Sequence, residues 1–349
     1  MPAQQHTAAL RKTLMKNQRI VLAARPTGEP NSENFRLEET DLAPLADGEV
    51  RIKHHYLSLD PYMRGRMNDS KSYAAPQALN ETMIGGTVGE IVESNNAKFL
   101  VGDKVVGMGG WQLYSTATCK GDATKVDSTH IPLSAYLGAM GMPGMTAWYG
   151  LIKICEPTAG ETVCVDSASG AVGSMVGQLA KLKGCRVIGI AGGKDKCDYV
   201  TDELGFDACI DYKANTGPKS LNAALKSAAP NGIDCHFENV GGMILDGVMA
   251  RMNAFGRIAM CGMISGYNGV PIPMAAPQLI LMSRLKIQGF IVSEHLQLWP
   301  EGLKEIGGHI GQGTIKFRET IADGLVNAPQ AFFDLLKGKN FGKQLVKLI

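Results

Sequence analysis

The chain has 349 residues, more than one hydrophobic core comfortably organises, so two domains are expected. Its 35 lysines and arginines nearly balance 33 aspartates and glutamates, and no long run of like charges favours a nucleic acid or a membrane as partner. The longest apolar run near the N-terminus, Ile20–Ala24, is too short for the core of a signal peptide. We therefore expect a cytoplasmic protein with reduced cysteines and a small-molecule partner.

The first part of the chain has the pattern of a β-rich domain. Residues 1–16 are polar without a clear period, and we expect part of this segment to be loose. Over residues 17–126, turn residues divide the chain into short strand-like pieces, which is typical of a compact, barrel-type domain. The alternation over residues 50–56 predicts that His54 faces inward and His55 outward. Neither cysteines nor a Glu-His cluster lie nearby in the sequence, so we expect no metal at this pair.

From Leu133 onward the pattern changes to helix, interrupted at Pro143, and strands then alternate with helices. This alternation is typical of βαβ units on a parallel sheet, here α/β and doubly wound. The last strand-like run, Lys343–Ile349, has no βαβ partner and is expected to return to the first domain. The six predicted sheet strands are Thr162–Val165, Arg186–Ala191, Ala208–Ile210, Ile233–Glu238, Arg257–Gly262 and Lys286–Val292. Predicted helical stretches include Met243–Met252, Leu298–Gly311 and Pro329–Leu336.

The stretch Thr162–Gly184 moves from strand to glycine-rich turn to helix within a few residues. Its turn, Ala168-Ser-Gly-Ala-Val-Gly173, fits the dinucleotide fingerprint G-x-G-x-x-G with alanine in the first position. First-turn N–H groups lack intrahelical partners and the helix dipole is positive at that end, so a pyrophosphate can dock against the backbone. Gly184 is placed for a left-handed helix end. A tight βα turn without a ligand is the alternative interpretation.

The segment after the next predicted strand bears on the choice of cofactor. About twenty residues beyond the fingerprint, an NAD-binding unit would place Asp or Glu to hold the ribose 2′-hydroxyl. Here the sequence is Gly192-Gly-Lys-Asp-Lys196. Small residues with two lysines leave space and positive charge for a 2′-phosphate, which favours NADPH over NADH. Asp195 argues against this choice, and an ordinary helical turn containing lysines is the alternative.

Five motifs carry a resemblance to a known family: Leu59-Asp-Pro-Tyr-Met-Arg-Gly65, Ser169-Gly-Ala-Val-Gly173, Glu238-Asn-Val-Gly-Gly242, Cys261-Gly-Met-Ile-Ser-Gly-Tyr267 and Gly338-Lys-Asn-Phe-Gly-Lys343. Over nearly its whole length the chain resembles the medium-chain dehydrogenase/reductase superfamily, specifically its zinc-independent, NADPH-dependent double-bond reductases. This group contains prostaglandin reductase, plant alkenal reductases and bacterial curcumin reductase, and the chain looks most like the last. The resemblance implies a homodimer, with a GroES-like β-barrel-type domain (1–132 and 300–349) and a Rossmann NADP-binding domain (133–299).

The resemblance also implies a metal-free site. Zinc-dependent members of the superfamily place ligands in two regions that here read Ile84-Gly-Gly-Thr-Val-Gly-Glu90 and Tyr56-Leu-Ser-Leu-Asp60. Both ligand positions are lost. The lobe of closely spaced cysteines that binds structural zinc is missing too, since no cysteine precedes Cys119.

The family's cofactor contacts are carried over where residues match. The resemblance assigns Tyr212 to the adenosine end of the cofactor; the alternative is an ordinary aromatic residue at a strand end. It also implies that Asn239 contacts the cofactor; the alternative is a residue that only forms the turn before two glycines. It implies that Asn340 reaches the cofactor from the C-terminal return. The pyrophosphate is assigned to Gly170, Ala171, Val172 and Gly173, and the 2′-phosphate to Lys196 beside Gly192. The nicotinamide and its ribose are assigned to Asn239, Cys261, Gly262, Met263, Ile264, Ser265, Tyr267, Phe290, Ile291 and Val292, the last three having core packing as their alternative.

The expected reaction is conjugate reduction of an α,β-unsaturated ketone or aldehyde, of the curcumin or alkenal type. Hydride transfer to the β-carbon leaves negative charge on the carbonyl oxygen, which needs hydrogen-bond donors. The resemblance puts Tyr267 and Tyr62 beside the nicotinamide as candidate hydrogen-bond donors. Alternatively, a ribose hydroxyl of the cofactor is the donor and Tyr267 orients it, or both tyrosines serve only packing or the shape of the substrate pocket. Arg64 and Arg66 are expected to be exposed and solvated. An NADPH quinone reductase and a non-catalytic NADPH-binding protein are the alternative functions.

Overall fold

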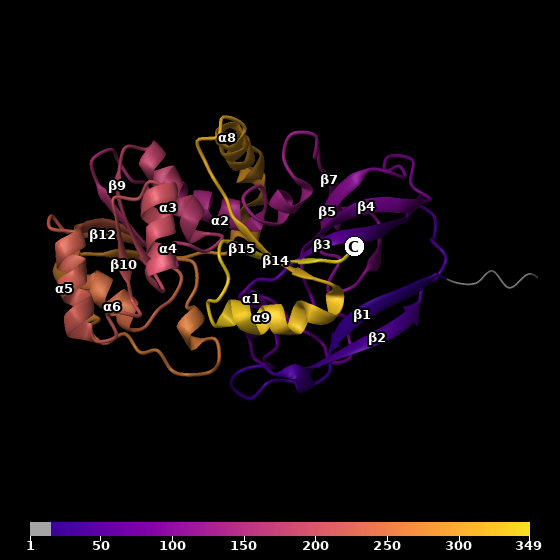
Figure 1. The fold of residues 1–349 in the computed structure, drawn as a ribbon, viewed down its shortest axis with the longest axis horizontal. Helices are drawn as coiled ribbons and strands as arrows, with labels where there is room; N and C mark the ends of the chain where they lie inside the picture. Colours follow the sequence, from indigo (N-terminus) through magenta and orange to yellow (C-terminus); the bar gives the residue numbers. More distant parts are fainter. Residues whose placement is uncertain (1–14) are drawn as a thin grey trace, which may run out of the picture.

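In the computed structural model, which describes residues 15–349, two large sheets occupy opposite ends of an elongated molecule (Figure 1). The expectation for residues 1–16 falls almost wholly on residues 1–14, outside the described part. Helix α8 and helix α9, with the last strands of the chain, lie between the two ends (Figure 1). Within residues 15–349, none of the helices combines the length and the apolar character needed to cross a bilayer.

The N-terminal end is built from short, mostly antiparallel strands, as predicted. β15 returns from the C-terminus and pairs antiparallel with β3, which confirms the expected return. The two-stranded sheet contains β1 (Lys16–Leu22) and β2 (Phe35–Asp41). The seven-stranded sheet contains β14 (Glu319–Asp323), β15 (Lys343–Lys347), β3 (Val50–Ser58), β4 (Thr87–Ser94), β5 (Lys104–Gly107) and β7 (Ala123–Lys125), with β6 (Tyr114–Ala117) paired to β3.

The other end is a six-stranded parallel sheet in the order β10-β9-β8-β11-β12-β13, which confirms the doubly wound α/β prediction. Its strands are β8 (Thr162–Asp166), β9 (Arg186–Ala191), β10 (Ala208–Asp211), β11 (Ile233–Glu238), β12 (Met252–Met260) and β13 (Lys286–Gly289). The helices are α1 (Tyr62–Arg66), α2 (Met142–Tyr149), α3 (Gly173–Leu182), α4 (Lys194–Asp198), α5 (Pro218–Ala228), α6 (Met243–Met249), α7 (Gln278–Ser283), α8 (Trp299–Gly311) and α9 (Ala328–Leu336).

Three predicted elements had the wrong bounds. The predicted helix Met243–Met252 ends at Met249, and the strand placed at Arg257–Gly262 runs over Met252–Met260, because the chain pairs with β11 directly after the helix. The strand predicted over Lys286–Val292 ends at Gly289. A 3-10 turn, Val292–Leu298, follows, and the Phe290 ring packs against Tyr149 with ring centroids 5.4 Å apart.

Side chains of the parallel sheet alternate between two cores. Val163 and Val165 join the apolar cluster under α2 and α3, whereas Cys164 belongs to the cluster under α5 and α6. The predicted apolar face of α3 is buried, including Met175 and Leu179. The helix ends as the sequence predicts, with Gly184 in the left-handed region at φ 78°.

The strand order fixes where a ligand can dock. The chain runs outward from β8 to β9 and β10, then crosses back to β11 on the other side of β8. This reversal between β8 and β11 is a topological switch point, and crevices at such points bind ligands at the carboxyl ends of the strands. Those ends are Asp166 and Glu238, directly before the phosphate-loop and Asn239 motifs.

Candidate active site

The predicted phosphate loop joins β8 to α3 and has the close approach that its glycines suggest. Ser167 has a φ of 47°, and the Gly170 N–H donates to its carbonyl oxygen at 2.8 Å. A Cβ at Gly173 would lie 2.4 Å from the same oxygen, so only glycine lets the helix begin this close to the strand. Ala171 and Val172 are half-exposed residues at the helix N-terminus. This cradle of backbone N–H groups fits a pyrophosphate.

The residues predicted for the adenosine end also lie together. Gly192 packs against the Tyr212 ring. Lys196 donates from Nζ to the Gly338 carbonyl at 2.6 Å. Burial lowers the pKa of Lys196, and the neighbouring charge of Lys213 lowers it further. Two lysine charges in one place fit a 2′-phosphate, which carries negative charge at neutral pH.

Sequence reasoning missed Lys213. The residue lies two positions after the end of β10, and its backbone N–H donates to Asp211 Oδ1 at 2.9 Å. Asp211 also accepts from the Gly193 N–H at 2.8 Å, so this carboxylate ties the Lys213 turn to the loop after β9. The position of Lys213 after a predicted strand could have indicated it, because the carboxyl ends of neighbouring parallel strands meet at one edge of a sheet.

Asn340 lies in a turn of the C-terminal return that touches the phosphate loop. Asn340 Nδ2 donates to the Gly342 carbonyl at 2.8 Å, and the Gly342 N–H donates to the Ser169 carbonyl at 2.9 Å. Gly342 has a φ of 62°, and a Cβ there would meet the Arg318 carbonyl at 1.8 Å, so glycine is required. The C-terminal return therefore contacts the phosphate loop through its backbone.

The loop that carries Tyr267 is fastened to the Asn239 turn. The Ile264 N–H donates to the Asn239 carbonyl at 3.0 Å, and the Met263 N–H donates to the Tyr267 hydroxyl at 3.4 Å. Ser265 donates to the Val240 carbonyl through its backbone at 3.1 Å. Burial raises the pKa of Tyr267, which keeps the phenol protonated as a donor.

The structure brings a third tyrosine to the two that were predicted. Tyr62 lies on α1, and burial followed by the charge of Asp60 raises its pKa. Tyr73 is close enough to both Tyr62 and Tyr267 to contribute to raising the pKa of each. Three neutral phenols therefore share one neighbourhood. Tyr73 was missed because it lies in an irregular loop, where no period marks its partners.

The expectation that Arg64 is exposed was wrong. Its side chain is only 2% exposed, and it donates to the Gly28 carbonyl at 2.7 Å and to Asn68 Oδ1 at 2.7 Å. A third bond, 3.2 Å long, runs to Asn268 Oδ1, directly after Tyr267. Arg64 is buried because all three oxygen acceptors converge on its guanidinium, which links the Tyr62 helix to the Tyr267 loop. Arg66 is half-exposed.

The remaining predicted contacts point partly into the core. The Phe290 ring lies 6.2 Å from that of Phe237, and Val292 is buried in the cluster under α2. Ile291 between them is half-exposed. Asn239 is half-exposed at the end of β11, while Cys261 and Gly262 begin the Tyr267 loop. The side chains of Phe290 and Val292 therefore belong to the packed core.

The positions corresponding to zinc ligands in zinc-dependent relatives carry no donor atoms here. Leu57 and Leu59 are buried in an apolar cluster with Met63, and a Cβ on Gly85 would lie 2.8 Å from the Leu57 side chain. A different group of potential ligands lies elsewhere, at the ends of β8 and β11. Asp166, His236 and Glu238 each offer an atom within 4.8 Å of the others. Sequence reasoning missed this cluster because the three residues lie on two strands that are distant in the sequence and otherwise mostly apolar.

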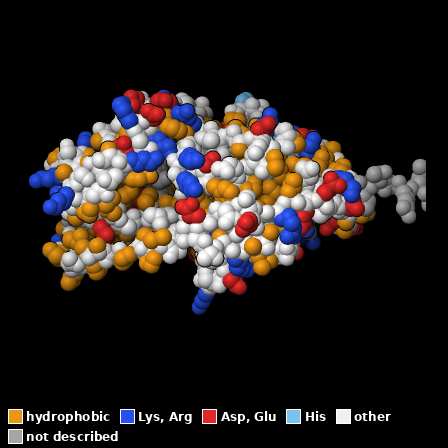
Figure 2. Space-filling model, turned by 60° about the horizontal axis from the view of Figure 1, so that its bottom comes forward, with side chains coloured by type: hydrophobic (Ala, Val, Ile, Leu, Met, Phe, Trp, Pro, Cys, Tyr) orange, Lys and Arg blue, Asp and Glu red, His pale blue; other side chains and the backbone are white. Residues whose placement is uncertain are grey.

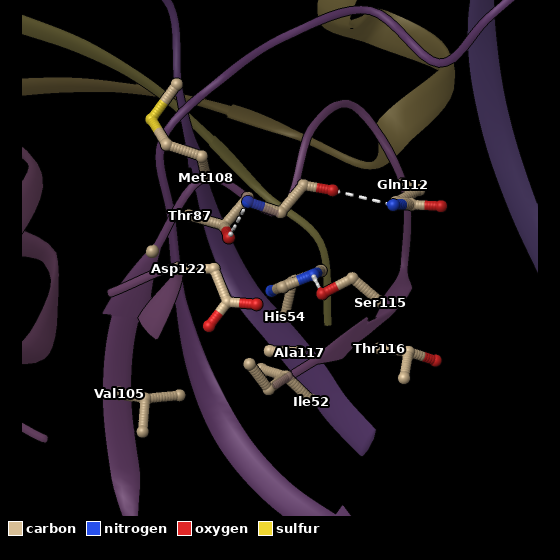
Figure 3. A pocket seen from close by; sticks show the side chains of 12 residues that line it. Ile52, His54, Thr87, Val105, Met108, Gln112, Ser115, Thr116, Ala117 and Asp122 are labelled. Atoms are coloured by element: carbon tan, nitrogen blue, oxygen red, sulfur yellow. Dashed lines mark hydrogen bonds between the residues drawn. The ribbon is translucent and has the colours of Figure 1, made fainter. Parts of the chain in front are cut away.

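A separate cavity of about 180 Å³ lies in the N-terminal domain, among residues of β3, β4, β5 and β6 (Figure 3). His54 is buried there, as predicted, and its Nε2 lies 2.9 Å from Ser115 Oγ. Burial lowers the pKa of His54 to about 3, so the ring is neutral. None of the predicted cofactor or catalytic residues lines this cavity, which is lined by Ile52, His54, Thr87, Val105, Gly107, Met108, Gly109, Gln112, Ser115, Thr116, Ala117 and Asp122.

The face of the molecule shown in Figure 2 carries charges of both signs. On this face, lysine and arginine side chains are interspersed with acidic ones. The phosphate cradle, the Lys196–Lys213 pair and the adjoining glycines instead concentrate anion recognition at one edge of the parallel sheet. Together these residues fit the phosphates of a dinucleotide that carries an added 2′-phosphate.

Comparisons with known proteins agree with this geometry. Residues 18–126 match the family described as the N-terminal domain of oxidoreductase, and residues 171–307 match the family described as zinc-binding dehydrogenase. The chain is 45% identical over 340 residues to the NADPH-dependent curcumin reductase of Escherichia coli (strain K12), covering 95% of this chain and 97% of that protein. It is 41% identical to the NADP(+)-dependent 2-alkenal reductase of Nicotiana tabacum, over 95% and 97% of the two chains.

A solved structure is similar over the same extent. The crystal structure of CurA from Vibrio vulnificus in complex with NADPH superposes with a TM-score of 0.89 at 46% identity. The match covers 95% of this chain and 99% of that one.

Proposed function

The chain belongs to the zinc-independent, NADPH-dependent double-bond reductases of the medium-chain dehydrogenase/reductase superfamily, and we propose that it reduces the carbon–carbon double bond of α,β-unsaturated ketones and aldehydes. The observation that carries this proposal is the position of Tyr267, a protonated phenol on a loop fastened to the Asn239 turn at the switch point. Curcumin reductase and alkenal reductase, to which the chain is similar, are both named for substrates of this class.

When bound, NADPH supplies the hydride for this reduction. The chain's own residues have two tasks, to bind this cofactor and to stabilise the charge that develops on the substrate. Tyr267 and Tyr62 are the proposed donors to the carbonyl oxygen, since their raised pKa keeps them protonated. An enolate shares its charge between oxygen and carbon, so neutral donors suffice where an alkoxide would call for a metal ion.

Binding and selection of NADPH fall to the cradle and the lysine pair. We propose that Gly170, Ala171, Val172 and Gly173 form the pyrophosphate cradle. Ala171, Val172 and Gly173 would offer backbone N–H groups, and Gly170, whose own N–H is bonded to Ser167, would leave room for the ligand. Lys196 and Lys213 would meet the 2′-phosphate. The proposed contacts near the nicotinamide are Asn239, the loop 261–267 and Phe290–Val292, with Tyr212 and Asn340 at the remaining edges.

The organisation of the protein is part of the proposal. We propose a barrel-type domain over 1–132 and 300–349 and a cofactor domain over 133–299, although α8 also packs on α2 through Ile306. A homodimer formed along β13 is proposed because this strand has an open edge among the described strands. All eight cysteines are free thiols, which supports a reducing, cytoplasmic setting.

The test uses NADPH deuterated at the transferred position and a simple enone. Deuterium at the β-carbon of a saturated ketone, detected by NMR, is the expected product. Deuterium at the carbinol carbon of an allylic alcohol would contradict the proposal. Parallel reactions with a quinone and with no acceptor separate the two alternatives, because a quinone reductase consumes NADPH only with the quinone and a binding protein consumes none.

A further inference from the structure

Three titratable side chains meet in the core of the parallel sheet, beneath the proposed nicotinamide site. Asp166 ends β8, while His236 and Glu238 lie two residues apart on β11 and so face the same side of the sheet. All three are fully buried. No cofactor or substrate contact proposed above uses their side chains.

The hydrogen bonds of His236 define its protonation. Its Nδ1 lies 3.1 Å from the carbonyl oxygen of Cys164, an atom that can only accept, so Nδ1 carries a proton. Its Nε2 lies 3.0 Å from Glu238 Oε2, a carboxylate oxygen. Because both ring nitrogens face acceptors, the arrangement is satisfied when both are protonated and the ring is cationic.

The hydrogen bonds of the two carboxyl groups also indicate which of them is ionised. Glu238 Oε1 accepts from the Val240 and Gly241 N–H groups, each at 2.6 Å, as an ionised carboxylate does. Burial opposes its ionisation, but the bond and charge of His236 prevail and hold the pKa of Glu238 at about 2. Asp166 Oδ1 accepts from the Asn239 N–H at 2.7 Å, whereas Oδ2 has no donor among the described residues.

A proton on Asp166 completes the network. Burial and the adjacent charge of Glu238 raise the pKa of Asp166 well above its usual value, and the protonated Oδ2 then donates to Glu238. The cation on His236, the anion on Glu238 and the neutral Asp166 sum to zero charge. The other titratable groups against the cluster are the thiols of Cys164 and Cys261, whose pKa values burial also raises, that of Cys261 to about 12.

This network lies under the residues that would contact the nicotinamide. Asp166 accepts from Asn239 twice, at Oδ1 and at its backbone carbonyl, the latter from Asn239 Nδ2 at 3.1 Å. The Glu238 carbonyl accepts from the N–H groups of Cys261 and Gly262, where the Tyr267 loop begins. The Asn239 turn and the Tyr267 loop are therefore both held by the two carboxyl residues.

We propose that His236 is a positioning residue, a buried imidazolium that, through ionised Glu238 and a neutral Asp166, fixes the Asn239 turn and the Tyr267 loop. Its effect on turnover rests on the proposed reductase function, but its protonation does not. The two can therefore be tested separately.

The first experiment is ¹⁵N NMR of histidine-labelled protein without cofactor, with the His236 signals identified by their loss in His236→Asn. Because both ring nitrogens face acceptors, protons on both are expected at neutral pH. A single ring proton would overturn the proposal, as would one equivalent of a divalent metal in the purified protein, because the metal would then replace the protons. The expected signature without any enone reduction would leave the network standing and refute only the proposed function.

The second experiment compares two isosteric variants. In Asp166→Asn the amide donates where the neutral acid did, so turnover within about twofold of wild type and an unchanged His236 signature are expected. In Glu238→Gln the anion is lost, so His236 should keep one ring proton and kcat should fall by about tenfold or more, with NADPH affinity nearly unchanged. Equal damage by both variants would overturn the proposal. Should Glu238→Gln fail to fold, the Asp166→Asn result and the wild-type spectrum still decide.

Discussion

At the scale of single residues, the phenol of Tyr267 is the group whose removal tests the chemistry most directly. Tyr267→Phe is expected to lower kcat by roughly ten- to a thousandfold, the range for losing one oxyanion donor, and to leave NADPH affinity nearly unchanged. Single-turnover kinetics and cofactor titration measure the two effects. Tyr136→Phe serves as the control, because its hydroxyl donates to the Asp127 carbonyl and neither residue is among the proposed site residues. A Tyr267→Phe enzyme with full kcat would exclude the phenol as donor.

The lysine pair makes a second prediction at this scale. Wild-type enzyme should prefer NADPH over NADH by at least about tenfold in kcat/KM, which corresponds to about 1.4 kcal/mol. Lys196→Ala and Lys213→Ala should each reduce this preference, since either removes one of two neighbouring charges. The exposed Lys219→Ala is the matched control. Equal use of both cofactors by the wild type would contradict the assignment.

At the scale of elements, β13 and the helix before it make the case for a dimer. β13 pairs only with β12 among the described strands, and α7 presents Leu281 at 79% exposure and Met282 at 64%. Exposed apolar side chains and an open strand edge are each costly in water unless a second chain covers them. Leu281→Lys should therefore shift the protein toward monomer without unfolding it, as light scattering would reveal. Leu100→Lys, at an exposed leucine on a barrel loop, should change nothing, and a monomeric wild type would refute the proposed interface.

At the scale of the whole molecule, one buried ion pair fastens the C-terminal return to Asp60, two residues before the Tyr62 helix. Lys343 donates from Nζ to Asp60 Oδ1 at 2.8 Å, with the two side chains 4% and 8% exposed. Lys343→Met leaves a buried charge unpaired, which typically costs about 3–5 kcal/mol of unfolding free energy. Urea unfolding measures this loss. Adding Asp60→Asn should recover part of it, and a double variant no more stable than Lys343→Met would argue against the pair as the cause.

The absence of zinc ligands at Leu57, Leu59 and Gly85 makes a prediction for the complete enzyme. Activity should survive exhaustive chelation, because the positions that bind zinc in zinc-dependent relatives are apolar here. The measurement is turnover before and after dialysis against a strong chelator, together with metal analysis. Activity lost on chelation and restored by zinc would overturn the metal-free mechanism.

The sequence by itself determined the doubly wound sheet, the phosphate turn and the C-terminal return. These features are encoded locally: short apolar runs for the buried strands, a 3.6-residue apolar period in α3 and glycines where the backbone approaches itself, as at Gly173. The bounds predicted for β12 and β13 were wrong, because a strand ends where its neighbour or the core no longer pairs with it, and the sequence pattern does not contain that neighbour.

Only the tertiary structure decided which distant side chains meet. Arg64 reads as a solvated loop residue until Gly28, Asn68 and Asn268 converge on it. Lys213 joins Lys196, and Asp166 joins His236 across two neighbouring strands, because parallel strands bring the ends of sequence-distant segments to one edge of the sheet. The protonation of such a group depends on burial and on the charges around it, and both are properties of the folded chain rather than of its sequence.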